Sequence, residues 1–394
     1  MAQKNKNLHK DNFVFVLISI YTFGGLGLEF LRRYDDRFES AFFSERLNVG
    51  FDAIIFLIIQ TASLWFFFLA ARELFRIPKI KKSENFIEIS QYILYFGVIC
   101  LFGLFGVYHL EYLWNPYPER FEGAFYVNAI ITLGSSVLIF AYNISKFRPL
   151  SVISFMLFTF AITYAASTGS RSAALPFLAF AGCALANRHS TAAAAFALLS
   201  LKALLAALTT RSDPSFSNFV ANFFAFDMSE IVTDLASVIS LSFPAGYTVQ
   251  AALNAQVAPD GFWTNILYLS PIPSSFLPEA IFEKSTLSDF FGFSSSVLGI
   301  NTDIYSDPVY RGGIIGAVTY PIFLCGLYIA SIFLAFSMPS RWQYSMVMLS
   351  RTLAVYSFVG GMVFSYRAAT RWQLVFILIL AVYVKVNGKK RIKL

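Results

Sequence analysis

FDAIIFLIIQTASLWFFFLAA, residues 51–71, carries one charged side chain and is otherwise almost continuously apolar. An α-helix needs ~20 such residues to cross the hydrocarbon core of a bilayer. The chain as a whole is 57% apolar and only 13% charged, against about 25% charged in soluble domains. Its apolar segments are 13–31, 51–71, 89–110, 124–143, 151–167, 173–187, 190–208, 313–337, 344–365 and 372–387. We therefore predict an all-α, polytopic membrane protein with about ten transmembrane helices.

The distribution of basic residues predicts which segments face which side. With the N-terminus in the cytoplasm, seventeen Lys and Arg fall in short inner loops and tails, and eleven fall on the longer outer segments. This is the positive-inside pattern. It places both termini in the cytoplasm and divides the chain into helices one to seven (1–208), a large outer loop (209–312), and helices eight to ten with a basic tail (313–394).

Arginine dominates the basic residues of the outer side. Of thirteen Lys only Lys284 is predicted to lie there, whereas ten of seventeen Arg do. A guanidinium group binds phosphate or carboxylate through two parallel hydrogen bonds, which an ammonium cannot do. The candidate diphosphate ligands are Arg171, Arg311, Arg367 and Arg371. In the first loop, the simpler interpretation is that Arg32, Arg33 and Arg37 pair with Asp35, Asp36 and Glu39.

The large loop holds ten acidic residues and three basic ones. Ser229 is a candidate cap for one short helix, and Pro244 for a second, AGYTVQAALNA. Both helices are expected to be amphipathic and to lie on the outer membrane surface. Further along, three prolines interrupt the stretch TNILYLSPIPSSFLPEAIFEK, residues 264–284, which includes Glu279.

Two carboxylates precede the predicted entry to the eighth span. Asp303 and Asp307 lie shortly before Arg311 and the pair Gly312-Gly313. A carboxylate there, or Glu279, is a candidate general base that takes a proton from a hydroxyl group. The alternative is an Asp-Pro turn with a structural ion pair.

The turn STGSRS, residues 167–172, separates two short apolar segments, which could instead form a re-entrant hairpin. Gly169 allows a tight turn, and Arg171 would then lie at the outer membrane–water boundary, where an isolated charge is unfavourable. One interpretation makes Arg171 a ligand for lipid phosphate. In the other, it reaches to the interface and caps a helix hairpin.

Several motifs are missing from the sequence. It has no Walker loop, no HExxH, no CxxC and no Asp-x-Asp, and its three Cys lack metal-ligand spacing. We therefore predict no metal and no cofactor. The basic residues flank spans rather than forming one patch, which argues against binding of nucleic acid.

Three short segments together resemble the Wzy-type O-antigen polymerases (oligosaccharide repeat-unit polymerases) of bacterial inner membranes. They are the Thr-Gly-Ser-Arg turn within 167–172, the proline-rich stretch 268–278, and the Tyr-containing Gly-Gly entry 301–316. The family often has Pro-Arg where Pro273 is followed here by Ser274, and Glu-Tyr where this chain has Asp303-Ile304-Tyr305.

The resemblance implies a metal-independent, inverting, GT-C-like glycosyltransferase of the inner membrane with its large loop in the periplasm. It would transfer a growing glycan from undecaprenyl diphosphate to another lipid-linked repeat unit. Arg171 would contact the diphosphate, and Ser170, Tyr305 and Tyr310 would contact other parts of the substrate. The expected partners are the lipid-linked oligosaccharide and the bilayer, and a chain-length regulator is a further candidate partner.

Three other functions remain open. An O-antigen ligase would transfer glycan to lipid A core, but that family relies on a His in its large outer loop, and 209–312 contains none. A lipid-linked oligosaccharide flippase or other transporter would be expected to have inverted repeats and charges near the bilayer midplane. No repeat is visible, and only Lys202 and Arg351 lie within spans. The third alternative is a non-catalytic partner in polysaccharide assembly.

Overall fold

The computed structural model describes residues 8–10, 12–39, 48–73, 76–78, 215–225, 243–255, 303–363 and 366–391, with isolated positions between 191 and 236. The chain divides into two compact units, one comprising 1–81, 236–339 and 345–394, and the other 82–235 and 340–344. The predicted spans 89–110, 124–143, 151–167 and 173–187 lie outside the described residues, as does most of 190–208.

Three described helices are long and apolar enough to cross a membrane, namely Phe13–Tyr34, Phe51–Ala70 and Ser306–Phe336. They coincide with the first, second and eighth predicted spans. The expected all-α class is confirmed for the described residues, which include only two three-residue strands.

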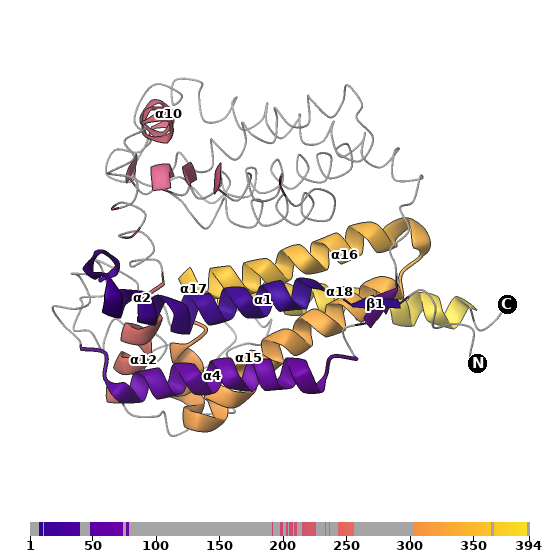
Figure 1. Ribbon diagram of the computed structural model, residues 1–394. Coiled ribbons are helices and arrows are strands. Elements are labelled where there is room, and N and C mark those ends of the chain that lie inside the picture. Colours follow the sequence, from indigo (N-terminus) through magenta and orange to yellow (C-terminus); the bar gives the residue numbers. More distant parts are fainter. Residues whose placement is uncertain are drawn as a thin grey trace. The chain divides into compact units, whose positions relative to one another are not determined.

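The first two spans form an antiparallel helical hairpin (Figure 1). The first is built from α1 (Asn12–Thr22), the π-helical segment η2 (Phe23–Gly27) and α2 (Leu28–Tyr34), and the second is α4 (Phe51–Ala70). Strands β1 (Leu8–Lys10) and β2 (Arg76–Pro78) pair antiparallel beyond the helix ends. The Trp65 indole N–H donates to Thr22 Oγ1 at 3.0 Å, which links the two helices.

Helix α15 (Ser306–Phe336) begins earlier than the sequence predicted. The expected entry at Gly312-Gly313 is instead a kink inside the helix, where Gly313 has φ 54°. Only glycine adopts such a φ readily. The kink brings the next turn so close to the first that a Cβ at Gly316 would collide with the Pro308 carbonyl.

The chain then returns through α16 (Ser340–Val355), the π-helical segment η8 (Tyr356–Gly360) and α17 (Gly361–Val363). The last helix, α18 (Tyr366–Arg391), contains the shorter apolar stretch Gln373–Val386. These helices cover the predicted spans 344–365 and 372–387.

Two helices of the large loop are described. Helix α10 (Phe216–Phe224) belongs to the second unit, and the Ser215 hydroxyl accepts a hydrogen bond from Asn218 N at its N-terminus. Helix α12 (Ala245–Asn254) begins after Pro244, as predicted, but seven of its ten residues are buried. The expectation that α12 exposes a polar face is therefore wrong, because its small residues pack closely among other helices, and its position relative to the membrane surface stays a prediction. The expected Ser229 helix lies almost entirely outside the described residues.

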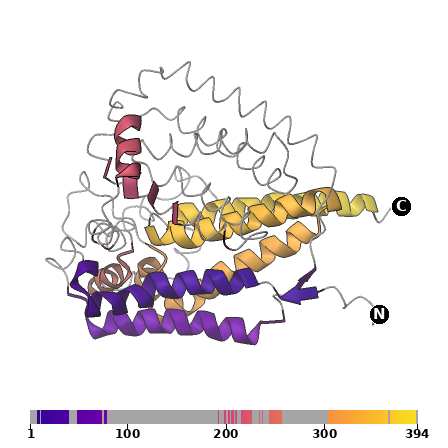
Figure 2. The same cartoon turned by 45° about the horizontal axis from the view of Figure 1, so that its top comes forward.

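The first unit has two distinct ends (Figure 2). At the strand end lie β1, β2 and the last turns of α18. At the loop end, α2 finishes, α4 and α15 begin, and α12 is attached through a 2.9 Å hydrogen bond from Gly50 N to Gln250 Oε1. The Ile304 amide donates to the Gly361 carbonyl at 2.9 Å, so α17 and the start of α18 also lie at the loop end.

Candidate functional site

Asp303 caps the N-terminus of α15. Its Oδ1 accepts hydrogen bonds from the backbone N–H groups of Tyr305 (3.0 Å) and Ser306 (2.6 Å). The Ser306 hydroxyl in turn accepts from Asp303 N at 3.1 Å. This reciprocal pair is a capping box with Ser in place of the usual Glu, and it satisfies backbone donors that a helix start leaves unpaired.

Helix α12 holds the other oxygen of the same carboxyl group. Thr248 Oγ1 lies 2.6 Å from Asp303 Oδ2, and both side chains are almost completely buried. Burial raises the pKa of Asp303, and the hydrogen bonds from Thr248, Ser306 and Tyr305 oppose that rise. Burial is the larger effect, since a charged carboxylate loses its hydration there.

Asp307 and Arg311 form an ion pair one turn further along α15. Arg311 Nε lies 3.1 Å from both carboxylate oxygens of Asp307, and the two side chains are 2% and 0% exposed. This is the structural ion pair that the sequence allowed as an alternative to a catalytic carboxylate. Tyr310 packs on α12 against Ala252 and Ala255.

Tyr305 anchors the start of α15 inside the helix bundle. Its hydroxyl donates to the Tyr21 carbonyl at 2.6 Å, and its own carbonyl accepts from Gln60 Nε2 at 2.8 Å. The Tyr21 and Tyr305 rings lie 4.7 Å apart, and a Cβ at Gly25 would approach the Tyr305 ring to 2.7 Å. The residue is 1% exposed, so these contacts give it an anchoring role, and its predicted contact with substrate stays a prediction.

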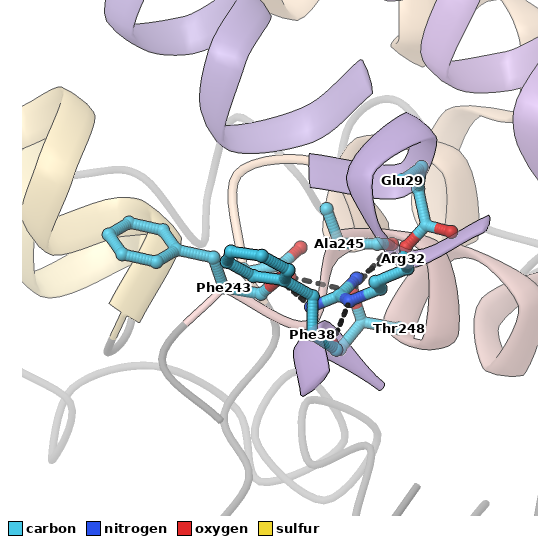
Figure 3. A network of polar contacts seen from close by, with 7 residues as sticks. Glu29, Arg32, Phe38, Phe243, Ala245 and Thr248 are labelled. Carbon is cyan, nitrogen blue, oxygen red and sulfur yellow. Dashed lines mark hydrogen bonds and ion pairs between the residues drawn. The ribbon is translucent and has the colours of Figure 1, made fainter. Parts of the chain in front are cut away.

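A second buried ion pair lies within α2, and its arginine also contacts the α12 segment (Figure 3). Arg32 pairs with Glu29, one turn earlier on α2, and both are nearly buried. Arg32 Nη2 donates to the Phe243 carbonyl at 2.6 Å, and Nε donates to the Phe38 carbonyl at 3.3 Å. The guanidinium carbon also lies 5.3 Å from the centre of the Tyr247 ring, within range of a cation–π interaction.

Nothing in the local sequence indicated the whole network. The predicted pairing of Arg32 with the acids of the first loop is wrong, because Arg32 pairs with Glu29, whereas the predicted pairing of Arg37 with Asp35 is confirmed at 2.7 Å. Hydrogen bonds from Arg37 lower the pKa of Asp35. The spacing Glu29-x-x-Arg32 was the available signal, because residues three apart are neighbours on a helix.

We use the name charged layer for the five buried charged residues at the loop end, which are Glu29, Arg32, Asp303, Asp307 and Arg311. Helix α12 and the residue before its N-cap connect the two halves of the layer, since Phe243 and Tyr247 contact Arg32, and Thr248 contacts Asp303. Residues more than 200 positions apart in the chain thus meet at one end of the bundle.

The remaining predicted site residues fall into two groups. Arg367 and Arg371 lie in the first two turns of α18, which starts at the loop end. Arg171, Ser170 and Glu279 lie outside the described residues. Within the described part of the chain, no group of three His, Cys, Asp or Glu could hold a metal ion.

Comparisons with known protein families, with curated proteins and with solved structures found no match.

Proposed function

We propose that this protein is a membrane glycosyltransferase that polymerises undecaprenyl-diphosphate-linked oligosaccharide repeat units. The observation that carries the proposal is the charged layer, which gathers three acids and two arginines at one end of an apolar helix bundle. Buried charges are costly in a membrane protein and are found mainly where function requires them.

Among the candidate bases, the geometry favours Asp303 over Asp307. Both Asp307 oxygens are engaged by the Arg311 guanidinium. The Asp303 carboxyl is instead hydrogen-bonded to the Thr248 hydroxyl and to two backbone N–H groups, and burial raises its pKa. A carboxyl with raised pKa is a better proton acceptor near neutral pH than an ordinary surface carboxylate.

The proposed reaction is a single displacement at the anomeric carbon of the donor. Asp303 takes the proton of an acceptor sugar hydroxyl, and that oxygen forms the new bond to the anomeric carbon. The bond from this carbon to the phosphate oxygen breaks, and undecaprenyl diphosphate leaves with the electron pair. The configuration is inverted.

Negative charge develops on the departing diphosphate, and fixed guanidinium groups stabilise such charge. Arg367 and Arg371 begin α18 at the same end of the bundle as Asp303, and Arg311 lies within the charged layer. Arg171 completes the proposed set from the sequence. The loop end would then face the periplasm, and the strand end, with Lys10 and Arg76, would face the cytoplasm.

The experiment is polymerisation by the purified protein, reconstituted in lipid and supplied with undecaprenyl-diphosphate-linked repeat units. Wild-type protein is expected to produce a ladder of chain lengths. Asp303→Asn, which keeps the shape of the side chain, is expected to produce none, whereas Asp36→Asn, at an exposed acid of the same end, is expected to resemble wild type. A wild-type ladder from Asp303→Asn would refute the assignment of the base.

One observation favours a transporter as the second candidate. The first span and the α16–α18 segment each contain a π-helical interruption, and α15 is kinked at Gly313. Broken helices are typical of secondary transporters. Vesicles that move lipid-linked repeat units across the bilayer without extending them would support this alternative, and elongation would exclude it as the sole activity.

A further inference from the structure

Thr248 has one hydroxyl proton and two acceptors within reach. Its Oγ1 lies 2.6 Å from Asp303 Oδ2 and 3.1 Å from the Ala245 carbonyl oxygen. A threonine hydroxyl donates one hydrogen bond and can accept others. It can therefore donate to only one of these two oxygens at a time, although both positions suit a hydrogen bond.

The opposite side of the carboxyl group is fixed. Asp303 Oδ1 accepts from two backbone N–H groups, those of Tyr305 and Ser306, and a backbone amide cannot become an acceptor. A proton bound by Asp303 must therefore reside on Oδ2, the oxygen that faces Thr248. The protonated carboxyl can then donate to Thr248 Oγ1.

We propose that Thr248 is a positioning residue whose hydroxyl proton follows the protonation state of Asp303. When Asp303 is ionised, Thr248 donates to Oδ2. When Asp303 carries a proton, it donates to Thr248 Oγ1, and the Thr248 hydroxyl turns to the Ala245 carbonyl. In both states the Asp303 carboxyl oxygens and the Thr248 hydroxyl keep a hydrogen-bond partner. Asp303 can therefore gain and lose a proton without any movement of the backbone.

The other ionisable side chains near Asp303 do not provide the hydrogen bond that Thr248 makes to its carboxyl group. Tyr21 on α1 and Tyr305 lie within electrostatic range of Asp303. From α12, Tyr247 contacts Arg32 rather than Asp303, and in the next turn of α15 Asp307 is held by Arg311. Thr248 is thus the only described side chain from another element that is hydrogen-bonded to the Asp303 carboxyl group.

The first test is the pH dependence of polymerisation, which also requires the proposed function. Thr248→Val removes the hydroxyl and keeps the shape. Because a hydrogen bond stabilises an ionised carboxylate more than a neutral carboxyl, the variant should need a higher pH for activity, with the acidic limb moved up by about one unit. Thr248→Ser, which restores the hydroxyl, should return the limb to its wild-type position.

The second test needs no enzymatic activity. Infrared titration of the carboxyl C=O band, as the difference between wild type and Asp303→Asn, reports the protonation of this one group. Thr248→Val should move the titration to higher pH, and Thr248→Ser should not. Thr248→Ala also lacks the hydroxyl, and it serves in the same role if the Val variant is not produced.

The two proposals fail separately. An unchanged titration in the variants that lack the hydroxyl overturns the role of Thr248, even if Asp303→Asn is inactive. A shifted titration together with an active Asp303→Asn supports the role of Thr248 and overturns Asp303 as the catalytic base.

Discussion

Charged side chains of the charged layer are buried at the loop end of the first unit, and those of an ion pair are exposed at its strand end. At the loop end, the charged layer is buried and each arginine is held by a carboxylate one turn away. At the strand end, Arg76 and Glu73 pair at 2.8 Å with side chains 48% and 60% exposed. Exposed pairs contribute little to stability because water and salt screen them, whereas removing one member of a buried pair leaves an uncompensated charge. The buried ion pairs at the loop end are therefore expected to matter far more for the stability of the bundle than those at the strand end.

The largest effect is expected from Arg32→Met at the loop end. The substitution leaves Glu29 buried without its partner and frees the Phe243 and Phe38 carbonyls. We expect a loss of about 3–5 kcal/mol in the free energy of unfolding in detergent, measured by denaturant titration. Arg76→Met at the strand end is the matched control and should change little. Equal losses in the two variants would remove the distinction between the ends.

A double variant sharpens this comparison. Glu29→Gln together with Arg32→Met removes both charges, so part of the stability lost in the single variant should return. Strict additivity of the losses in the two single variants would mean that the charges of Glu29 and Arg32 are not energetically coupled.

The second prediction concerns the space between these helices. A Cβ at Gly246 would collide with the Glu29 carboxylate, whereas a Cβ at Gly312 would have no atom within 4 Å. Gly246→Ala should therefore cost about 1–3 kcal/mol through overpacking. Gly312→Ala, the control, should be neutral or slightly stabilising because alanine loses less backbone entropy on folding. Thermal unfolding of the two variants under identical conditions checks the contrast, and a stable Gly246→Ala would mean that α12 is not packed so closely on Glu29.

The sequence predicted those parts of the fold that depend on local pattern. The segments 13–31 and 51–71 matched helices because length and apolar content alone identify a span, and Pro244 marked the start of α12. The start of α15 was missed because a Gly-Gly pair serves equally well at a helix entry and at a kink inside a helix.

The candidate site was harder to predict than the fold. The contact of Thr248 with Asp303 spans 55 positions, and that of Tyr305 with Tyr21 spans 284. Nothing in the local sequence indicates which distant residue will satisfy a buried polar group. The sequence could nominate Asp303, Asp307 and Arg311, but it could not reveal that α12 joins them to Arg32.

The third prediction tests the anchor between α15 and the first span. Tyr305→Phe removes only the hydroxyl that donates to the Tyr21 carbonyl. The expected loss is about 0.5–1.5 kcal/mol, the usual net contribution of one hydrogen bond. Tyr34→Phe is the control, since Tyr34 is 87% exposed. If both substitutions have the same effect on thermal unfolding, the Tyr305 hydroxyl does not stabilise the attachment of α15.

The smallest effect is expected at the strand end and depends on salt. Glu73→Gln removes the charge that pairs with Arg76, and because both side chains are substantially exposed, the change in stability should be about 0.5 kcal/mol or less at low ionic strength. Raising the salt concentration to 1 M should remove even this difference, because screening then acts within about 3 Å. The Arg32→Met loss at the loop end should persist under the same conditions, because solvent ions do not reach a buried pair. Unfolding measured for both variants at low and high salt decides this, and a salt-sensitive Arg32 loss would mean that the loop-end pair is hydrated and not part of the interior.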